Sequence, residues 1–418
     1  MKENGINRDR QIYELYSKYV NESYPAFLKK LGLDCQASFA ESCTITDSGG
    51  KTYIDCVGGY GVFNLGHNNE RIVNAVIDQL NKKSLITRPL IIEANIEVAE
   101  IMREVLGGQL ESLFLCNSGS EAIDTSMKLA RLCTGRKEII TATNSFHGFT
   151  FGALSATGIP AFKRSFEPLV PGIEHVPFGD IDALCERISE RTAAILLEPV
   201  QHEAGIHIPP KGYFYEVRRL CDELGVLLIL DEIKTGVGKT GRMFAMEHFD
   251  VIPDILVLGK SFGGGIIPIG AVIGKKKLWK KFSLSFAMSA SSFAGNALAC
   301  RAAIETITIV REGDLLENCV HKGARILDVI NSLVLRYGKI LKSVRGMGLL
   351  VGIETRSPKV AFAIAREMIS LGVLIFPSFG NSSVLMVEPP LVITMEQVDE
   401  VLDAFDRAFY NVAFSDSG

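Results

Sequence analysis

Short runs of aliphatic residues alternate with stretches of helical periodicity through the middle of the chain. Between about residues 61 and 312, the apolar runs predict strands near 112–116, 137–143, 193–199, 226–231, 255–258 and 269–273, with helices between them. Nearly continuous apolar runs indicate strands buried on both faces, as in a mainly parallel sheet covered by helices. The pattern therefore predicts an α/β fold that binds its ligand at the carboxyl ends of the strands.

The two flanking regions differ from this middle part. Residues 1–60 carry helical and short strand signals, and an amphipathic helix over 315–337 is followed by alternating strand and helix signals to about residue 412. We predict three parts: an N-terminal arm (1–60) that joins the smaller domain, a large domain (61–312), and a C-terminal α+β domain (313–418).

Two charged residues follow directly on predicted strands. Asp231 ends one aliphatic run, and Lys260 closes another before a glycine-rich turn. A lysine can condense with an aldehyde to form a Schiff base, and an aspartate opposite a pyridine nitrogen keeps the ring protonated. Taken singly, such an aspartate is often a helix cap and such a lysine a surface group. Together they indicate pyridoxal 5'-phosphate as the cofactor.

Two further segments have the features of a cofactor site. Ser118, Gly119 and Ser120 lie between a predicted strand and an amphipathic helix, where backbone amides and hydroxyls can bind phosphate. An ordinary helix cap is the alternative. Phe146 follows the predicted strand 137–143, and its ring either stacks on a flat cofactor or belongs to the core.

These segments, in this order, resemble the class III (omega) pyridoxal-phosphate-dependent aminotransferases of fold type I. The resemblance covers nearly the whole chain, and 54–64 and 175–181 are most similar to the putrescine aminotransferase branch. The other matching segments are Glu198-Pro-Val-Gln, Asp231-Glu-Ile-Lys-Thr-Gly, Gly259-Lys-Ser-Phe-Gly-Gly-Gly, Ser292-Phe-Ala-Gly-Asn-Ala, Val344-Arg-Gly-Met-Gly-Leu and Val387-Glu-Pro-Pro.

The resemblance implies a role for each matching residue. Lys260 is the Schiff-base lysine and Asp231 the partner of the pyridinium nitrogen. Ser292 matches a threonine that reaches the phosphate from the other subunit, so we expect a homodimer with shared active sites. The other implied cofactor contacts are Ser118, Gly119, Ser120, Phe146, His147, Glu198 and Lys234.

The implied reaction moves an amino group from a primary amine to a keto acid by a ping-pong mechanism. Many relatives bind a substrate carboxylate with an arginine three residues before the Pro-Pro pair, but Met386 stands there. Glu203 matches the glutamate that faces this arginine, and it either receives a substrate amine or bonds to nearby backbone. We therefore expect a diamine or another omega-amine as the donor.

Two residues have open roles. Relatives usually have glutamine where this chain has Lys234, which either bonds to the cofactor's phenolic oxygen or turns away from it. Arg88 is a candidate to hold the keto-acid carboxylate, and a surface arginine is the alternative.

The composition excludes several classes of protein. The chain has 418 residues, of which 47% are hydrophobic, and its net charge is −4, so no nucleic-acid partner is expected. Its apolar runs are shorter than the ~18 residues that span a membrane. Nine cysteines without a Cys-x-x-Cys pair indicate reduced thiols and a cytoplasmic location. The seven histidines lack metal-ligand spacing, so no metal is expected.

Other functions stay open for the sequence. One is an acetylornithine or ornithine aminotransferase, against which Met386 counts. Others are a class III aminotransferase of a specialised biosynthetic pathway that acts on an aldehyde or ketone intermediate, and a relative that decarboxylates, racemises or moves an amine within one molecule. The last is a cofactor-free scaffold, against which Lys260, Asp231 and Phe146 count.

Overall fold

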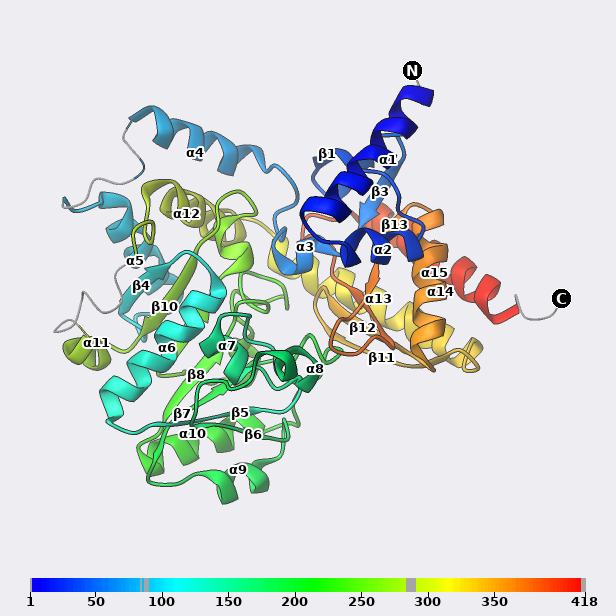
Figure 1. Cartoon of the computed structure of the whole chain (residues 1–418). Coiled ribbons are helices and arrows are strands. Elements are labelled where there is room, and N and C mark those ends of the chain that lie inside the picture. Colours follow the sequence, from blue (N-terminus) through cyan, green and yellow to red (C-terminus); the bar gives the residue numbers. More distant parts are fainter. Residues whose placement is uncertain (1, 83–84, 86–89, 283–290, 415–418) are drawn as a thin grey trace.

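A seven-stranded sheet forms the centre of the larger half of the molecule. The computed structural model describes residues 2–82, 85, 90–282 and 291–414 (Figure 1). The sheet has the order β4-β10-β9-β8-β7-β5-β6, and only β10 runs antiparallel to its neighbours among these described strands. The strands are β4 (Ser112–Cys116), β5 (Glu138–Ala142), β6 (Ile173–Val176), β7 (Thr192–Leu197), β8 (Leu227–Asp231), β9 (Ile255–Leu258) and β10 (Gly270–Gly274).

Alternate side chains of the central strands enter two different cores. Along β8, Leu228 and Leu230 belong to one apolar cluster, whereas Leu227 and Ile229 belong to another. Successive residues of a strand point to opposite faces, so both faces of this sheet are buried. This confirms the predicted α/β fold, and the six predicted strands lie within two residues of the observed ones. The pattern missed β6, a short edge strand with two polar residues among its four.

Helices cover both faces of this sheet (Figure 1). Helix α6 packs on one face against β7, β9 and β10, and α10 packs against β8. The helices of this half are α4 (Glu70–Lys82), α5 (Glu93–Val105), α6 (Gly119–Thr134), α7 (Phe151–Ala156), α8 (Pro160–Lys163), α9 (Ile181–Arg187), α10 (Tyr213–Leu224), α11 (Lys276–Phe282) and α12 (Ala297–Glu312).

The smaller half is built from both ends of the chain. The N-terminal elements are α1 (Lys2–Tyr19), α2 (Ser23–Lys30), β1 (Ala37–Glu41), β2 (Thr44–Asp47), β3 (Thr52–Asp55) and the short α3 (Gly58–Gly61). The C-terminal elements are α13 (Leu315–Arg336), β11 (Leu341–Met347), β12 (Leu350–Thr355), α14 (Pro358–Ser370), β13 (Val373–Leu374), β14 (Phe376–Pro377), β15 (Val384–Val387) and α15 (Met395–Phe414).

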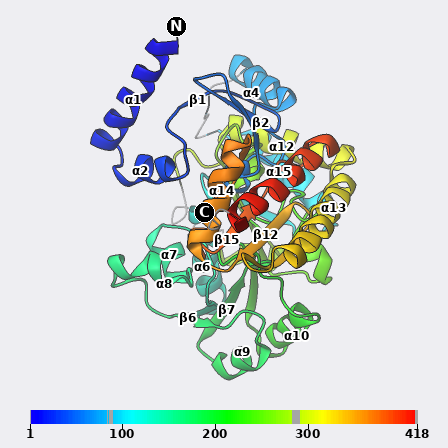
Figure 2. The ribbon, with the colours of Figure 1, turned by 90° about the vertical axis from the view of Figure 1, so that its right-hand side faces the viewer.

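Contacts between these two groups join the ends of the chain. Strand β3 pairs in parallel with β13. Helix α2 lies beside α14 (Figure 2), and the Phe27 ring of α2 is 6.1 Å from the Phe362 ring of α14. Leu31 and Tyr53 belong to the same apolar cluster as Phe405 of α15. The division of the chain at residues 60 and 312 stays a prediction. In the described part of the chain, no helix is both long and apolar enough to cross a membrane.

Candidate active site

The carboxyl ends of three neighbouring strands bring together the residues singled out by the sequence. Asp231 is the last residue of β8, Glu198 directly follows β7, and Lys260 comes two residues after β9. They line a cavity of about 160 Å³. The predicted cofactor residues that line it with them are Ser118, Gly119, Ser120, Phe146, His147 and Lys234.

Asp231 is held rigidly by two hydrogen bonds. Its Oδ2 atom lies 2.7 Å from Nδ1 of His147, and its Oδ1 accepts the backbone N–H of Ile233 at 3.0 Å. The other nitrogen of His147 contacts the Thr141 hydroxyl at 3.1 Å. Both partners of this pair are buried. The pair therefore presents a fixed carboxylate to the cavity, which suits a protonated ring nitrogen.

The N-terminus of α6 lines the same cavity. Ser118 caps the helix by accepting the N–H of Glu121 at 3.2 Å. The first amides of a helix have no intrahelical partner and attract anions. Gly119 lets this turn pack closely, since a Cβ there would lie 2.8 Å from Cδ1 of Ile233. The turn can therefore hold a phosphate group.

Lys260 begins a short 3₁₀ turn, η3 (Lys260–Gly263), with a backbone φ of 46°. A left-handed conformation is unfavourable for a lysine, and such strain is concentrated at functional sites. Burial of the amine, together with the charge of Lys234, lowers the pKa of Lys260 to about 8. Part of the Lys260 population is therefore free base near neutral pH, as condensation with an aldehyde requires.

Phe146 is half-buried and its backbone is tied to Glu198. One carboxylate oxygen of Glu198 accepts the Phe146 N–H at 3.3 Å, and the other lies 3.0 Å from Nδ1 of His202. The Phe146 ring meets the His202 ring edge-on, with centroids 6.1 Å apart. Phe146 and Glu198 both line the cavity, and a position of Phe146 there is what the stacking hypothesis needs.

Glu203 lies beside His202, to which the sequence analysis gave no role. Nε2 of His202 lies 3.4 Å from the Glu203 carboxylate. Burial opposes ionisation of Glu203, but His202, Lys234 and Lys260 outweigh it and hold its pKa at about 2. Burial and Lys260 likewise oppose protonation of His202, yet Glu198 and Glu203 raise its pKa. Glu203 therefore lies beside a histidine whose pKa is raised, whereas Met386 stands where relatives have an arginine.

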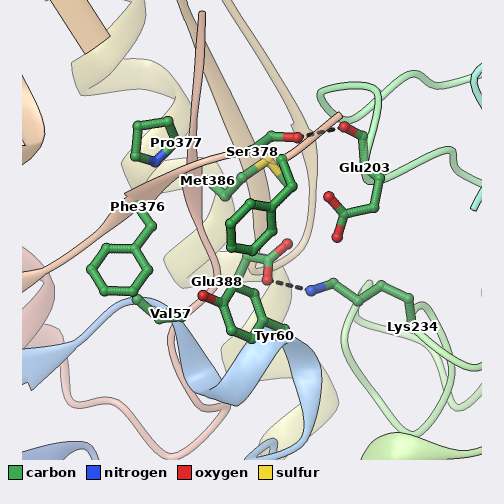
Figure 3. A pocket seen from close by; sticks show the side chains of 10 residues that line it. Val57, Tyr60, Glu203, Lys234, Phe376, Pro377, Ser378, Met386 and Glu388 are labelled. Carbon is green, nitrogen blue, oxygen red and sulfur yellow. Dashed lines mark hydrogen bonds and ion pairs between the residues drawn. The ribbon is translucent and has the colours of Figure 1, made fainter. Parts of the chain in front are cut away.

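Lys234 connects the cofactor cavity to a second pocket. It is the only described residue that lines both, and its Nζ forms a buried ion pair with Glu388 (Figure 3). Gly61 makes room for it, because a Cβ there would lie 2.8 Å from Cδ of Lys234. The described residues of this second pocket, called the donor pocket below, are Val57, Tyr60, Glu203, Lys234, Phe376, Pro377, Ser378, Phe379, Met386 and Glu388.

The remaining predicted residues have different outcomes. Met386 lies in the donor pocket with Glu203. Ser292 is exposed and lines neither of the two pockets. Arg88 lies outside the described residues.

His202 and Glu388 belong to the site, although the sequence analysis gave neither a role. His202 directly precedes Glu203, and Glu388 directly precedes the Pro-Pro pair. Both are titratable residues within or directly after a segment that matches the family, and this could have singled them out in the sequence.

The cavity fits pyridoxal phosphate at three points. Lys260 offers the aldehyde an amine with a lowered pKa, and Asp231 offers the ring nitrogen a fixed carboxylate. The N-terminus of α6 offers its free amides to the phosphate. Within the described ranges, no group of three histidine, cysteine or acidic residues could hold a metal ion.

Comparisons with known proteins agree with this arrangement. The model of the family described as aminotransferase class-III matches residues 30–409. The structure of ornithine aminotransferase from Toxoplasma gondii ME49 has 29% identity and a TM-score of 0.90, covering 97% of this chain and 95% of that one.

Two amine-converting enzymes are similar as well. An amine transaminase from an uncultivated Pseudomonas species, in its PLP-bound form, has 26% identity and a TM-score of 0.84, covering 90% of this chain and 95% of that one. An (S)-enantioselective omega-transaminase from Thermomicrobium roseum has 27% identity and a TM-score of 0.84, covering 90% of this chain and 93% of that one.

Proposed function

The chain belongs to the class-III aminotransferases and is a pyridoxal-phosphate-dependent transaminase; we propose that its amino donor is a primary amine without a carboxylate near the reacting carbon. The donor is a diamine or another omega-amine, as in the putrescine aminotransferase branch. A keto acid is the acceptor, and the two substrates react in turn by a ping-pong mechanism.

The charge pattern of the donor pocket carries this proposal. Met386 occupies the position from which an arginine would bind a donor carboxylate, and no described residue lining the pocket is an arginine. Lys234 is already paired with Glu388, and His202 lies between Glu198 and Glu203. A donor carboxylate would meet Glu203 and Glu388 without a free cation. An alkyl or ammonium group meets no such repulsion.

Lys260 is the acid–base group of the proposed reaction. Bound pyridoxal phosphate supplies the aldehyde that takes up the amino group and the ring that withdraws electrons when a C–H bond breaks. The Lys260 amine removes the proton from the donor carbon next to nitrogen, and it returns a proton to the corresponding carbon of the keto acid. The pKa of about 8, lowered by burial and Lys234, keeps part of this amine able to accept a proton.

Other residues orient the reacting groups. Asp231 holds the proton on the ring nitrogen, and His147 holds Asp231. The α6 N-terminus with Ser118, Gly119 and Ser120 would hold the phosphate, and Phe146 would stack on the ring.

We assign Ser292 to the active site of a second subunit. Its exposure in one chain supports a homodimer in which it reaches the partner's phosphate. We also place the enzyme in the cytoplasm, which is supported by nine cysteines that all carry free thiols.

Turnover with a panel of donors tests the proposed function. Each donor is supplied with one keto acid, and the amino acid formed is compared with the keto acid consumed. We expect putrescine, cadaverine or a simple alkylamine to give equal amounts of both. Turnover only with ornithine or acetylornithine would instead assign the chain to the ornithine-type activity of its Toxoplasma relative.

A further inference from the structure

The donor pocket contains more negative than positive charge. Glu203 and Glu388 direct their carboxylates into it, and Lys234 is the one cation among its described lining residues (Figure 3). The neighbouring His202 is already placed between Glu198 and Glu203. A cationic ligand would therefore meet two carboxylates and one lysine among the described residues that line this pocket.

Glu388 carries an oxygen without a hydrogen-bond partner. Its Oε2 is paired with Lys234, whereas its Oε1 is buried and has no partner among the described residues. The side chain is only 3% exposed. An unpartnered buried carboxylate oxygen is costly, so such an atom in a pocket points to a donor that arrives with a ligand.

The backbone around Glu388 is held from two sides. Its N–H donates to the Cys56 carbonyl at 2.8 Å, and its own carbonyl accepts from the buried amine of Lys239 at 3.4 Å. Lys239 also donates to the Pro389 carbonyl at 3.0 Å. These bonds fix the backbone at Glu388, and the ion pair with Lys234 orients its carboxylate. Such order before a substrate binds lowers the entropy cost of binding.

Aromatic side chains form the walls beside these carboxylates. The rings of Tyr60 and Phe379 lie 5.7 Å apart, and Phe376 lines the same pocket. Aromatic walls pack well against a methylene chain, and their faces attract ammonium groups. The chemistry of these walls therefore suits a ligand with an apolar middle and a positive end.

We propose that Glu388 Oε1 and Glu203 form a subsite for the second ammonium group of an α,ω-diamine donor. The inference rests on the proposed function, and it names α,ω-diamines as the donor class. The first amino group reacts in the cofactor cavity, the methylene chain passes Lys234, and the second ammonium receives the two carboxylates. Lys234 holds Glu388 in place at the junction of the two pockets.

The test compares diamines with monoamines of the same length. n-Pentylamine matches putrescine, and n-hexylamine matches cadaverine, with a methyl group in place of the second ammonium. We expect holoenzyme to favour each diamine by about ten- to hundredfold in kcat/KM, because a charge-assisted bond is lost in the monoamine. Glu388→Gln and Glu203→Gln should each lower this ratio, and the exposed Glu396→Gln should leave it unchanged.

The ratio removes those effects of Glu388→Gln that act on both amines alike, such as a change in the cofactor. An unpaired Lys234 would repel only the second ammonium of a diamine, so Glu203→Gln, which keeps the pair of Lys234 with Glu388, is the decisive variant. A binding measurement provides a second readout: calorimetry with N,N,N′,N′-tetramethylputrescine, which cannot condense with an aldehyde, should show weaker binding to Glu388→Gln than to the unchanged enzyme.

The possible failures are distinct. Equal use of putrescine and n-pentylamine by the unchanged enzyme, or ratios that both substitutions leave intact, would overturn the subsite while the amine-donor function stands. Rejection of all four amines with turnover of ornithine would overturn the proposed function itself.

Discussion

The cofactor cavity and the donor pocket lie side by side but are built in different ways. The cavity takes Asp231, Glu198 and Lys260 from the ends of adjacent strands in one sheet. The donor pocket combines residues near 57–60, 203, 234 and 376–388, so four separate segments of the chain meet there. The sheet fixes the first set of positions. The second set depends on how loops and the smaller half pack. Its side chains other than Lys234, which lines both sites, can therefore change without disturbing the cofactor.

Loss of Lys260 should lower turnover more than any other substitution, and it acts through the cofactor cavity rather than the donor pocket. Lys260→Ala removes both the amine that holds the cofactor and the acid–base group, and we expect turnover to fall by about 10⁴-fold with every donor. The visible absorbance of the lysine-bound cofactor should disappear too. The exposed Lys128→Ala is the control. Near-normal turnover of Lys260→Ala would contradict the assignment.

Asp231→Asn should have the next largest effect. The amide cannot keep a proton on the ring nitrogen, and it weakens the contact to His147. We expect kcat to fall by about 10²–10³-fold for all donors alike, as when one preorganised electrostatic group is removed. Steady-state kinetics with two different amines checks this. A fall for one donor only would place Asp231 in substrate recognition instead.

Met386→Arg should change the donor pocket and leave the cofactor in place. A guanidinium opposite Glu203 can bind a carboxylate in two hydrogen bonds, so the kcat/KM ratio of ornithine to putrescine should rise by about ten- to hundredfold. Met386→Leu keeps the apolar character and should retain the original ratio. An unchanged ratio in Met386→Arg would mean that donor carboxylates are rejected elsewhere.

Ser292 offers a smaller test of the shared cavity. Ser292→Ala should weaken cofactor affinity about tenfold, because a hydrogen bond to a charged phosphate is lost. Ser292→Thr keeps the hydroxyl and should bind like the unchanged protein. Equilibrium dialysis of the cofactor gives both affinities. Equal affinity of all three proteins would remove Ser292 from the phosphate site.

The smallest expected effect is that of Lys234, which lines both pockets, on the pKa of Lys260. Lys260 must lose a proton before it reacts with an aldehyde, so incorporation of the cofactor into cofactor-free enzyme should speed up as pH rises through about 8. Burial lowers the pKa of Lys260 most, and the charge of Lys234 lowers it further, against Glu203, Glu388 and Asp231. Lys234→Met should therefore shift the midpoint of this pH profile upward.

Lys234→Arg is the matched control for that shift. It keeps the positive charge and should keep the midpoint close to that of the unchanged enzyme. A midpoint that stays in place or moves down in Lys234→Met would show that Lys234 does not act on Lys260.

The contrast between the cofactor cavity and the donor pocket also explains how much of the site could be predicted from the sequence. Asp231 and Lys260 follow apolar strands, and strand ends meet at one edge of a sheet, so their convergence was predictable. The partner of Glu203 was not, because His202 carries no pattern of its own and matters only through its orientation. Lys234 and Glu388 are 154 positions apart, and nothing in either segment predicts their ion pair.

The central claim is a carboxylate-free amine donor, and the visible absorbance of cofactor-loaded enzyme tests it most directly. Putrescine, cadaverine, a simple alkylamine, ornithine and GABA are added one at a time without a keto acid. We expect the absorbance of the lysine-bound cofactor to bleach with the diamines, less readily with the alkylamine, and not with ornithine or GABA. Bleaching by ornithine or GABA alone would contradict it.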